Sequence, residues 1–269
     1  DAYTFNTTCP FVEKVWKRSA QLGEEGFTVV IHGKATHEET RATFSHSIRS
    51  APTVVVLDLG EALLLAKVIR GEVDLETFHT HFAGACSVGF DPALHLERLG
   101  VVNQTTMLAS ETREIAQILR QAMVDRYGKN EVDDHFANTS DTLCYATNEN
   151  QNATYALIEQ GADLALVVGG YNSSNTSHIV ELCEEAMPTY FVQNADGILS
   201  ESGIRHFSLA SHKMVTTEGW LPDKRPLDVV LTCGASCPDA IVDGVLLRVL
   251  SFFEQSRPVE EALAFYPVV

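Results

Sequence analysis

Short hydrophobic runs alternate with longer amphipathic stretches along most of the 269-residue chain. Continuous runs rich in Val and Ile are typical of strands that are buried on both faces of a parallel sheet. Amphipathic stretches bounded by a polar cap and a glycine are typical of the helices that cover such a sheet. In the first half, the pattern predicts strands at 27–33, 53–59 and 100–105, and helices at 61–69 and from a cap at Ser110 to Gly128.

The same alternation returns after a polar, acidic segment at 129–140. We therefore place a boundary there and predict an α/β fold of two similar domains, 1–135 and 136–269, with small parallel sheets flanked by helices. In the second half, the pattern predicts strands at 162–170, 189–193 and 228–236, helices at 148–161, 174–187 and 239–255, and a Gly- and Ser-rich loop region before the last strand.

The composition indicates a folded protein and limits the classes of partner that it is expected to bind. Hydrophobic residues make up 45% of the chain and charged residues 20%, which is enough for a core and unlike a disordered chain. The formal net charge of -17 disfavours nucleic acid and anionic membrane surfaces as partners. No apolar run approaches the roughly 18 residues that a membrane span needs. A small anionic ligand remains compatible, because local amide groups can hold phosphate.

Polar residues gather directly after the predicted strands, where ligands bind in parallel α/β sheets. In GGYNSSNTSH, Ser173, Ser174 and Asn175 open a helix beside two glycines. This arrangement suits a phosphate cradle without a Walker lysine, and the alternative is an ordinary helix cap. CGASCPD has the same arrangement, in which a strand is followed by a glycine, a serine and a helix. Ser236 lies just before the predicted helix, which begins at Pro238.

Two further motifs follow strands in the first half. HGKATHEET puts His37, Glu38 and Glu39 in the loop after the first strand. A histidine beside a carboxylate can bind metal, hold phosphate or relay a proton, and the alternative is a solvated loop. NQTTM adds Thr105 and Thr106 at another strand end, and it is uninformative by itself.

Six scattered cysteines favour a reduced compartment over a disulfide framework. Cys9 stands before Pro10 at the head of an amphipathic helix, where the helix dipole favours a thiolate. Cys144, in DTLCYAT, has a similar setting. The two cysteines do not form a CxxC zinc motif. They are interpreted either as thiolates of a cluster shared between the domains or as two buried thiols.

Taken in order, six motifs resemble the 4-hydroxy-3-methylbut-2-enyl diphosphate reductase family (IspH/LytB), in the form found in plants and cyanobacteria. The resemblance runs from Thr8 to about Val249. It implies reductive removal of a hydroxyl group from an allylic diphosphate, giving isopentenyl and dimethylallyl diphosphate in the last step of the methylerythritol phosphate route to isoprenoids. The motifs are TTCPFVEKVW, HGKATHEET, NQTTM, DTLCYAT, VVGGYNSSNTSH and TCGASCPD.

The resemblance also implies a cofactor, partners and site residues. The family places three similar α/β domains around a 4Fe–4S cluster held by one cysteine from each, so Cys9 and Cys144 are implied as two of its ligands. Glu39 is implied as the proton donor, and Thr105 as a residue that positions the substrate hydroxyl. The expected electron donor is a ferredoxin or flavodoxin, and the expected compartment is bacterial cytoplasm or plastid stroma. The implied diphosphate contacts are His37, Ser173, Ser174, Asn175 and Ser236.

The sequence departs from the family in one respect: it has no GFCxGV-like motif, which carries the first cluster cysteine. We therefore expect the family's first domain to be absent from this chain and the third ligand to come from that domain, rather than from Cys233 or Cys237. Cys86 and Cys183 are interpreted as packing residues. The alternative function is a two-domain fragment that binds diphosphate without a stable cluster. A zinc- or nucleotide-binding protein is disfavoured by the missing CxxC, GxGxxG and Walker motifs.

Overall fold

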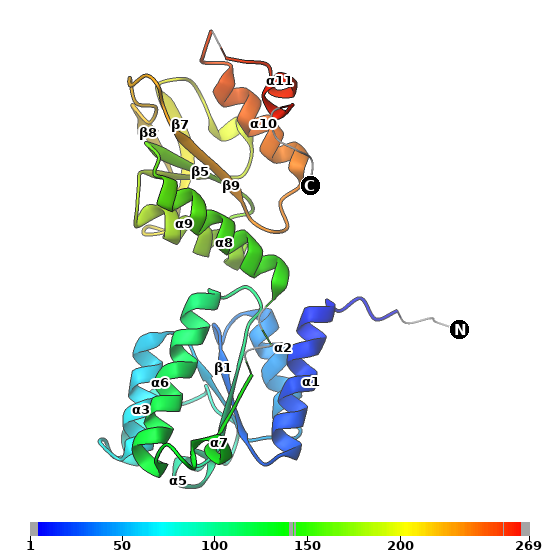
Figure 1. Ribbon diagram of the computed structural model, residues 1–269, viewed down its shortest axis with the longest axis vertical. Helices are drawn as coiled ribbons and strands as arrows, with labels where there is room; N and C mark the ends of the chain where they lie inside the picture. Colours follow the sequence, from blue (N-terminus) through cyan, green and yellow to red (C-terminus); the bar gives the residue numbers. More distant parts are fainter. Residues whose placement is uncertain (1–4, 140–141, 143, 255, 265–269) are drawn as a thin grey trace. The chain divides into compact units, whose positions relative to one another are not determined.

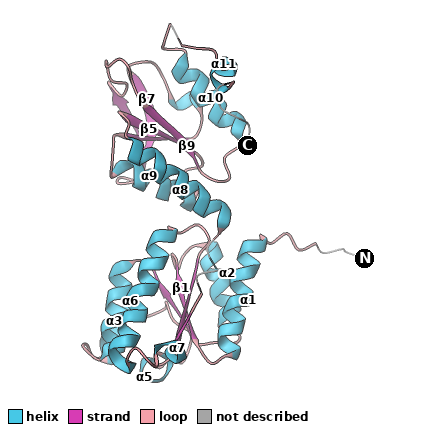
Figure 2. Cartoon of the chain, in the orientation of Figure 1, coloured by secondary structure: helices cyan, strands magenta, loops and turns pink. Residues whose placement is uncertain are grey.

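The chain forms two compact units, Asp1–Asn148 and Glu149–Val269, each with its own sheet (Figures 1 and 2). The structure is a computed structural model that describes residues 5–139, 142, 144–254 and 256–264. Ser140, Asp141 and Leu143, at the start of the DTLCYAT region, lie outside the described residues. Alternating strands and helices confirm the predicted α/β class, with one parallel and one mixed sheet.

The first unit is built on a parallel four-stranded sheet of order β2-β1-β3-β4. Its three longer strands are buried along their whole length, as the continuous Val- and Ile-rich runs predict. The pairing of β3 with β4 carries this sheet to residue 137, past the expected boundary at residue 135. The strands are β1 (Thr28–His32), β2 (Thr53–Val56), β3 (Leu99–Asn103) and β4 (Phe136–Ala137).

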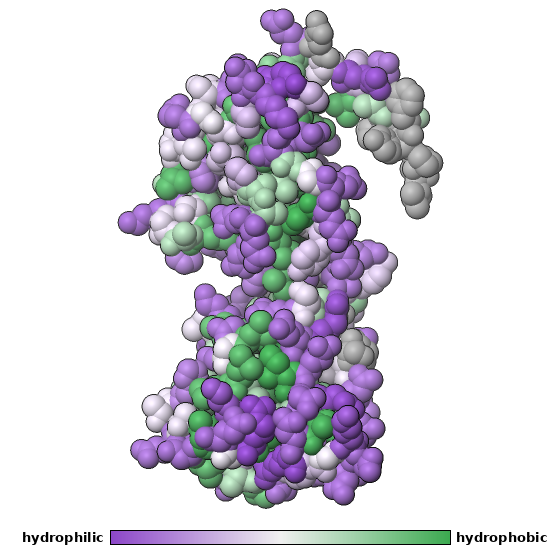
Figure 3. Space-filling model, turned by 60° about the vertical axis from the view of Figure 1, so that its left-hand side comes forward, coloured by the Kyte–Doolittle hydropathy of each residue, from purple (hydrophilic) through white to green (hydrophobic). Residues whose placement is uncertain are grey.

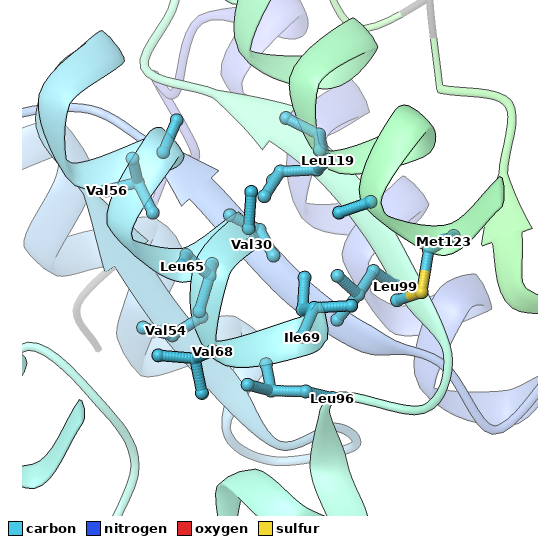
Figure 4. Close-up of a cluster of buried hydrophobic side chains, with 14 of the residues drawn as sticks. Val30, Val54, Val56, Leu65, Val68, Ile69, Leu96, Leu99, Leu119 and Met123 are labelled. Atoms are coloured by element: carbon cyan, nitrogen blue, oxygen red, sulfur yellow. The ribbon is translucent and has the colours of Figure 1, made fainter. Parts of the chain in front are cut away.

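Helices cover both faces of this sheet (Figure 1). Along β1, Val29 and Ile31 pack in the cluster that includes Val15 and Leu22 of α1, whereas Val30 points to the opposite face. Figure 4 shows Val30 beside Leu119 on that second face, which α3 and α6 cover. The helices are α1 (Pro10–Glu24), α2 (Glu38–Ser47), α3 (Leu59–Arg70), α4 (Leu75–His81), α5 (Pro92–His95), α6 (Ala109–Tyr127) and α7 (Val132–His135).

A glycine in the central strand β3 lets helix α1 approach the sheet. A Cβ atom at Gly100 would lie 2.5 Å from Cδ2 of Leu22, which is wholly buried. Any larger residue at position 100 would therefore push α1 away from the sheet. The amphipathic face predicted for α1 is only partly buried, because Val15 lies in the core while Phe11 is exposed.

The second unit has a mixed five-stranded sheet of order β8-β7-β6-β5-β9. Its parallel part, β6-β5-β9, follows the prediction, and β7 and β8 add an antiparallel edge. The elements are α8 (Tyr145–Gln160), β5 (Leu164–Val168), α9 (Ser174–Glu184), β6 (Thr189–Val192), a short 3-10 helix η2 (Ala195–Gly197), β7 (Gly203–Ser208), β8 (Lys213–Glu218), β9 (Val229–Cys233), α10 (Asp239–Leu250) and α11 (Val259–Leu263).

The hairpin β7–β8 lies within the region that the sequence pattern assigns to loop. Strand β8 is mostly exposed and reads KMVTTE, so it lacks the hydrophobic run that marks a buried strand. Two other local predictions are also wrong. Helix α6 begins at Ala109 with Leu108, not Ser110, as its N-cap, and Glu38 and Glu39 lie in the first turn of a helix rather than in a loop.

Hydrophilic side chains predominate on the face drawn in Figure 3, and hydrophobic surface is confined to smaller areas. Within the described residues, no helix combines the length and the apolar character that crossing a bilayer requires.

Candidate functional site

In the first unit, the loop after β1 places His37 at the N-cap of α2. Its Nδ1 accepts a hydrogen bond from the backbone N–H of Glu39 at 3.2 Å. A ring nitrogen that accepts from an amide carries no proton, so the neutral imidazole holds its proton on Nε2. His37 is half-buried and therefore offers an N–H donor near the end of β1.

Two donors from one residue hold the carboxylate of Glu39. The backbone N–H of Thr105 donates to Oε1 at 2.5 Å, and its hydroxyl donates to Oε2 at 2.8 Å. Thr105 lies just after β3 and is 8% exposed. Because both oxygens are engaged, the carboxylate is fixed in orientation beside the histidine. The geometry brings together His37, Glu39 and Thr105, three of the predicted site residues.

The side chain of Gln104 links the segments that follow β1 and β3 through hydrogen bonds. We did not single this residue out from the sequence. Its side chain is wholly buried, and its Oε1 accepts from the Thr40 hydroxyl at 2.8 Å and from the Lys34 N–H at 3.2 Å. Its Nε2 donates to the Thr106 hydroxyl at 2.6 Å. A Cβ at Gly33 would lie 2.7 Å from the Thr40 hydroxyl oxygen, so this loop needs a glycine. The only signal in the sequence was the position of Gln104 within NQTT.

Both predicted cluster cysteines directly precede a helix, Cys9 before α1 and Cys144 before α8. Cys9 is exposed at the N-cap of α1, with Pro10 in the first helical position and no side-chain cap bond. Cys9 is the residue before α1, and Figure 1 shows the N-terminal end of α1 at the end of the sheet where β1 ends. Its exposure removes the alternative of a buried thiol.

Cys144 is half-buried and directly precedes α8. The Thr142 hydroxyl donates to Oδ1 of Asn103, the last residue of β3, at 3.0 Å. This bond holds the segment before Cys144 at the same sheet edge. We expected one cysteine from each domain, whereas residue 144 falls in the first of the two compact units.

In the second unit, polar side chains and glycines gather where β5, β6 and β9 end. The Ser173 hydroxyl caps α9 by accepting from the Thr176 N–H at 3.3 Å, and Ser174 opens the helix. The hydroxyl oxygen of Thr176 would lie 2.7 Å from a Cβ at Gly169 and 2.0 Å from one at Gly234. Close approach of both loops to α9 therefore requires the two glycines.

Asn175 is the strongest ligand signal in this unit. The residue is 5% exposed, and its Oδ1 and Nδ2 are both buried without a hydrogen-bond partner among the described residues. Leaving a buried donor or acceptor unpaired costs about 1–3 kcal/mol, so such an amide is typical of a ligand site. The Ser173 bond shows an ordinary cap, but a cap alone does not explain Asn175.

A cavity of about 200 Å³ lies at the same edge of this sheet. It is smaller than a site for a drug-sized molecule. Ser236 lines it after β9, whereas Ser173, Ser174 and Asn175 do not. A larger apolar cavity of about 740 Å³ lies between β9 and α10 and contains none of the predicted site residues. The lining residues of the small cavity are Gly169, Gly170, Thr176, Gln193, Ser236, Cys237, Pro238 and Ile241.

The cysteines interpreted as packing residues lie against hydrophobic cores. Cys183 is wholly buried in α9, and burial raises the pKa of its thiol to about 11. Burial also raises the pKa of Cys86, which packs against the core of the first unit. Among the described residues, no three His, Cys, Asp or Glu side chains gather in a way that would hold a metal ion.

Together these features define an α/β protein with a carboxylate held by two hydrogen bonds after the strands of one sheet. After the strands of the other sheet it has a helix N-terminus with a buried amide that has no partner among the described residues. The chain belongs to the LytB protein family, whose model matches residues 1–250. It is 41% identical over 250 residues to the 4-hydroxy-3-methylbut-2-enyl diphosphate reductase of Synechococcus sp. (strain CC9311), covering 93% of this chain and 61% of that protein. The same-named protein of Gloeobacter violaceus is 42% identical over 245 residues, covering 91% of this chain and 58% of that protein.

The chain therefore spans about three-fifths of the length of these relatives. Among solved structures, the E-1-hydroxy-2-methyl-but-2-enyl-4-diphosphate reductase from Plasmodium falciparum matches with a TM-score of 0.58. The match covers 90% of this chain and 58% of that chain at 18% identity, so it supports the fold alone.

Proposed function

We propose that the chain acts in the reductive dehydroxylation of (E)-4-hydroxy-3-methylbut-2-enyl diphosphate to isopentenyl and dimethylallyl diphosphate. Membership of the LytB family and the names of its relatives support the reaction. The single observation that carries the substrate class is the buried, unpartnered amide of Asn175 at a helix N-terminus.

In the second unit, the proposed role is to bind the diphosphate. The Nδ2 group of Asn175 donates to a phosphoryl oxygen, and the N-terminal end of the α9 helix dipole favours negative charge. Ser173 and Ser174 at that helix start, and Ser236 after β9, add hydroxyl donors. Binding energy from the diphosphate then orients the reacting end of the molecule, which contributes to the rate.

In the first unit, the proposed role is to supply the proton. Glu39 donates to the leaving hydroxyl, so that the oxygen departs as water. Thr105 positions the carboxyl group, and its hydroxyl can reverse to accept a hydrogen bond when Glu39 is protonated. The Nε2–H of His37 donates to a phosphoryl oxygen.

Cys9 and Cys144 fit the 4Fe–4S cluster that the family resemblance implies, since each is a free thiol directly before a helix. They would supply two of its three thiolates; among the described residues, no three His, Cys, Asp or Glu side chains gather to hold a metal ion. When bound, such a cluster supplies electrons and a Lewis-acidic iron. The ferredoxin or flavodoxin donor, the compartment and the source of the third ligand stay predictions.

Titration with inorganic pyrophosphate tests the substrate class. Asn175→Leu should weaken binding roughly tenfold or more, because one donor is lost from a buried site. Asn172→Ala, an exposed change in the same loop, is the matched control and should keep its affinity within about twofold. Equal affinity of Asn175→Leu and the unmodified chain would contradict the proposal. Iron and sulfide analysis of anaerobic protein tests the cluster separately.

A further inference from the structure

Two cysteines frame the turn that carries Ser236 into the small cavity of the second unit. Cys233 is the last residue of β9, and Cys237 comes directly before the N-cap of α10. The turn between them is closed by a hydrogen bond from the Cys237 N–H to the Gly234 carbonyl at 2.8 Å. Both thiols are free and half-buried, and both pack against the same hydrophobic cluster.

The two thiols lie four residues apart across this closed turn, and each is among the side-chain groups that influence the pKa of the other. The Cys237 thiol is directed to the Pro238 carbonyl oxygen at 3.8 Å. The turn therefore carries two free thiols close together in the chain, beside the residue that lines the cavity.

We propose that Cys233 and Cys237 form a reversible dithiol–disulfide pair that regulates anion binding at the cavity beside Ser236. The anion is the diphosphate of the proposed function, so this inference rests on that proposal. Because Cys237 and Ser236 line the same cavity, a change in the position of one affects the other. The oxidant is a small-molecule disulfide, for which glutathione disulfide is the probe.

The exchange reaction is balanced in two steps. The thiolate of Cys237 attacks one sulfur of glutathione disulfide, and one glutathione leaves as the mixed disulfide forms. The thiolate of Cys233 then attacks the Cys237 sulfur and releases the second glutathione. The protein pair loses two electrons and two protons, and the oxidant becomes two glutathione thiols. Burial raises the pKa of both cysteines, so the reaction accelerates as pH rises.

Disulfide formation should reshape the turn rather than the sheet. Cys233 is paired with Val168 across the parallel ladder, and its carbonyl accepts from Nδ2 of Asn150 at 2.6 Å. A disulfide brings sulfur atoms to about 2.05 Å, closer than any hydrogen bond between thiols. Because the backbone of Cys233 is held on both sides, Cys237 and the turn that carries Ser236 should move when the disulfide forms.

Peptide mapping of the full chain tests the bond itself. Trypsin cleavage after Lys224 and Arg248 yields one peptide, 225–248, that contains these two cysteines and no others. After treatment with glutathione disulfide at pH 8.5, this peptide should be about 2 Da lighter and should resist alkylation until a reductant is added. A stable glutathione adduct, or two alkylated thiols, would overturn the proposal.

Pyrophosphate titration tests the regulation. Oxidation should weaken binding by about threefold or more, and reduction should restore it. Cys233→Ala and, as a second variant, Cys237→Ala should make the affinity insensitive to the oxidant, whereas Cys86→Ala in the other unit should stay sensitive. A disulfide that leaves affinity unchanged would refute the regulatory role. Failure of the reduced, unmodified chain to bind pyrophosphate would instead refute the proposed function.

Discussion

Thr105 gives both of its hydrogen-bond donors to the carboxylate of Glu39, across 66 positions of the chain. One donor is a backbone amide that no ordinary substitution removes, and the other is a hydroxyl that can be deleted. This arrangement separates the proton carried by Glu39 from the positioning supplied by Thr105. The two contributions can be measured one at a time.

Glu39→Gln should lower turnover by about 10²- to 10⁴-fold and leave pyrophosphate binding within about twofold, since the amide cannot deliver a proton. The measurement is reduction of the allylic diphosphate by cluster-loaded protein with a chemical reductant. Glu38→Gln is the matched control, because that neighbouring side chain is 90% exposed. Equal loss of turnover and of pyrophosphate affinity would contradict a proton-donor role for Glu39.

Thr105→Val should reduce turnover by about tenfold and shift the pH profile of the reaction, because one carboxylate oxygen loses its partner while the backbone N–H remains. Thr105→Ser keeps the hydroxyl and should restore most of the activity. A merely structural role would instead lower the melting temperature of the valine variant without moving its pH profile.

Asn175→Leu should stabilise the ligand-free chain by about 1–2 kcal/mol while weakening pyrophosphate binding. The substitution replaces two unpartnered buried polar atoms by apolar atoms of similar size. Urea unfolding without ligand is the measurement. Loss of stability in this variant would mean that the amide has a structural partner, and it would remove the main support for a ligand at this position.

Gly100→Ala should destabilise the first unit by about 1–3 kcal/mol, because the new methyl group meets Leu22 of α1 at 2.5 Å. Gly244→Ala, in helix α10, is the control: a Cβ there meets nothing within 4 Å, so helix stability should rise slightly. Circular dichroism during urea unfolding reports both effects. A neutral Gly100→Ala would show that α1 does not pack tightly on β3.

Cys183 should resist alkylation at pH 8.5 in the folded chain, whereas the exposed Cys9 should react first. The folded pKa of Cys183, about 11, lies above the unfolded value near 8.5. The unfolded state therefore loses its proton first, and this contribution to stability is lost as pH rises from about 8.5 through 11. Timed iodoacetamide labelling with mass spectrometry gives the order, and early labelling of Cys183 would contradict its burial.

The parallel strands were predictable because they are continuous hydrophobic runs, and β1 and β5 lie within a few residues of their predicted positions. The hairpin β7–β8 was not, since exposed edge strands carry little hydrophobic signal. Helix α2 was missed for a related reason. Its sequence, EETRATFSHS, is polar on most faces, and its buried side is formed by Thr40, Thr43 and Ser47.

The candidate site residues could be named from the sequence as polar positions after strands, but their contacts could not. That His37 caps a helix, and that Thr105 holds Glu39, depends on how the ends of β1 and β3 lie side by side in the sheet. Asn175 could be named from its motif, yet only the packed structure shows that its amide has no partner. The roles expected of these residues come from the family resemblance, and the structure adds a physical reason for some of those roles.

Gln104 has a consequence for how the loops around Glu39 can vary. Its amide oxygen takes two donors and its amide nitrogen serves one acceptor, so a single neutral side chain satisfies three partners of both kinds. Glutamate lacks the donor, lysine lacks the acceptor, and asparagine is one methylene shorter. We therefore expect a saturation library at position 104 to retain essentially only glutamine. Of the positions in the NQTT motif, this buried one should tolerate substitution least.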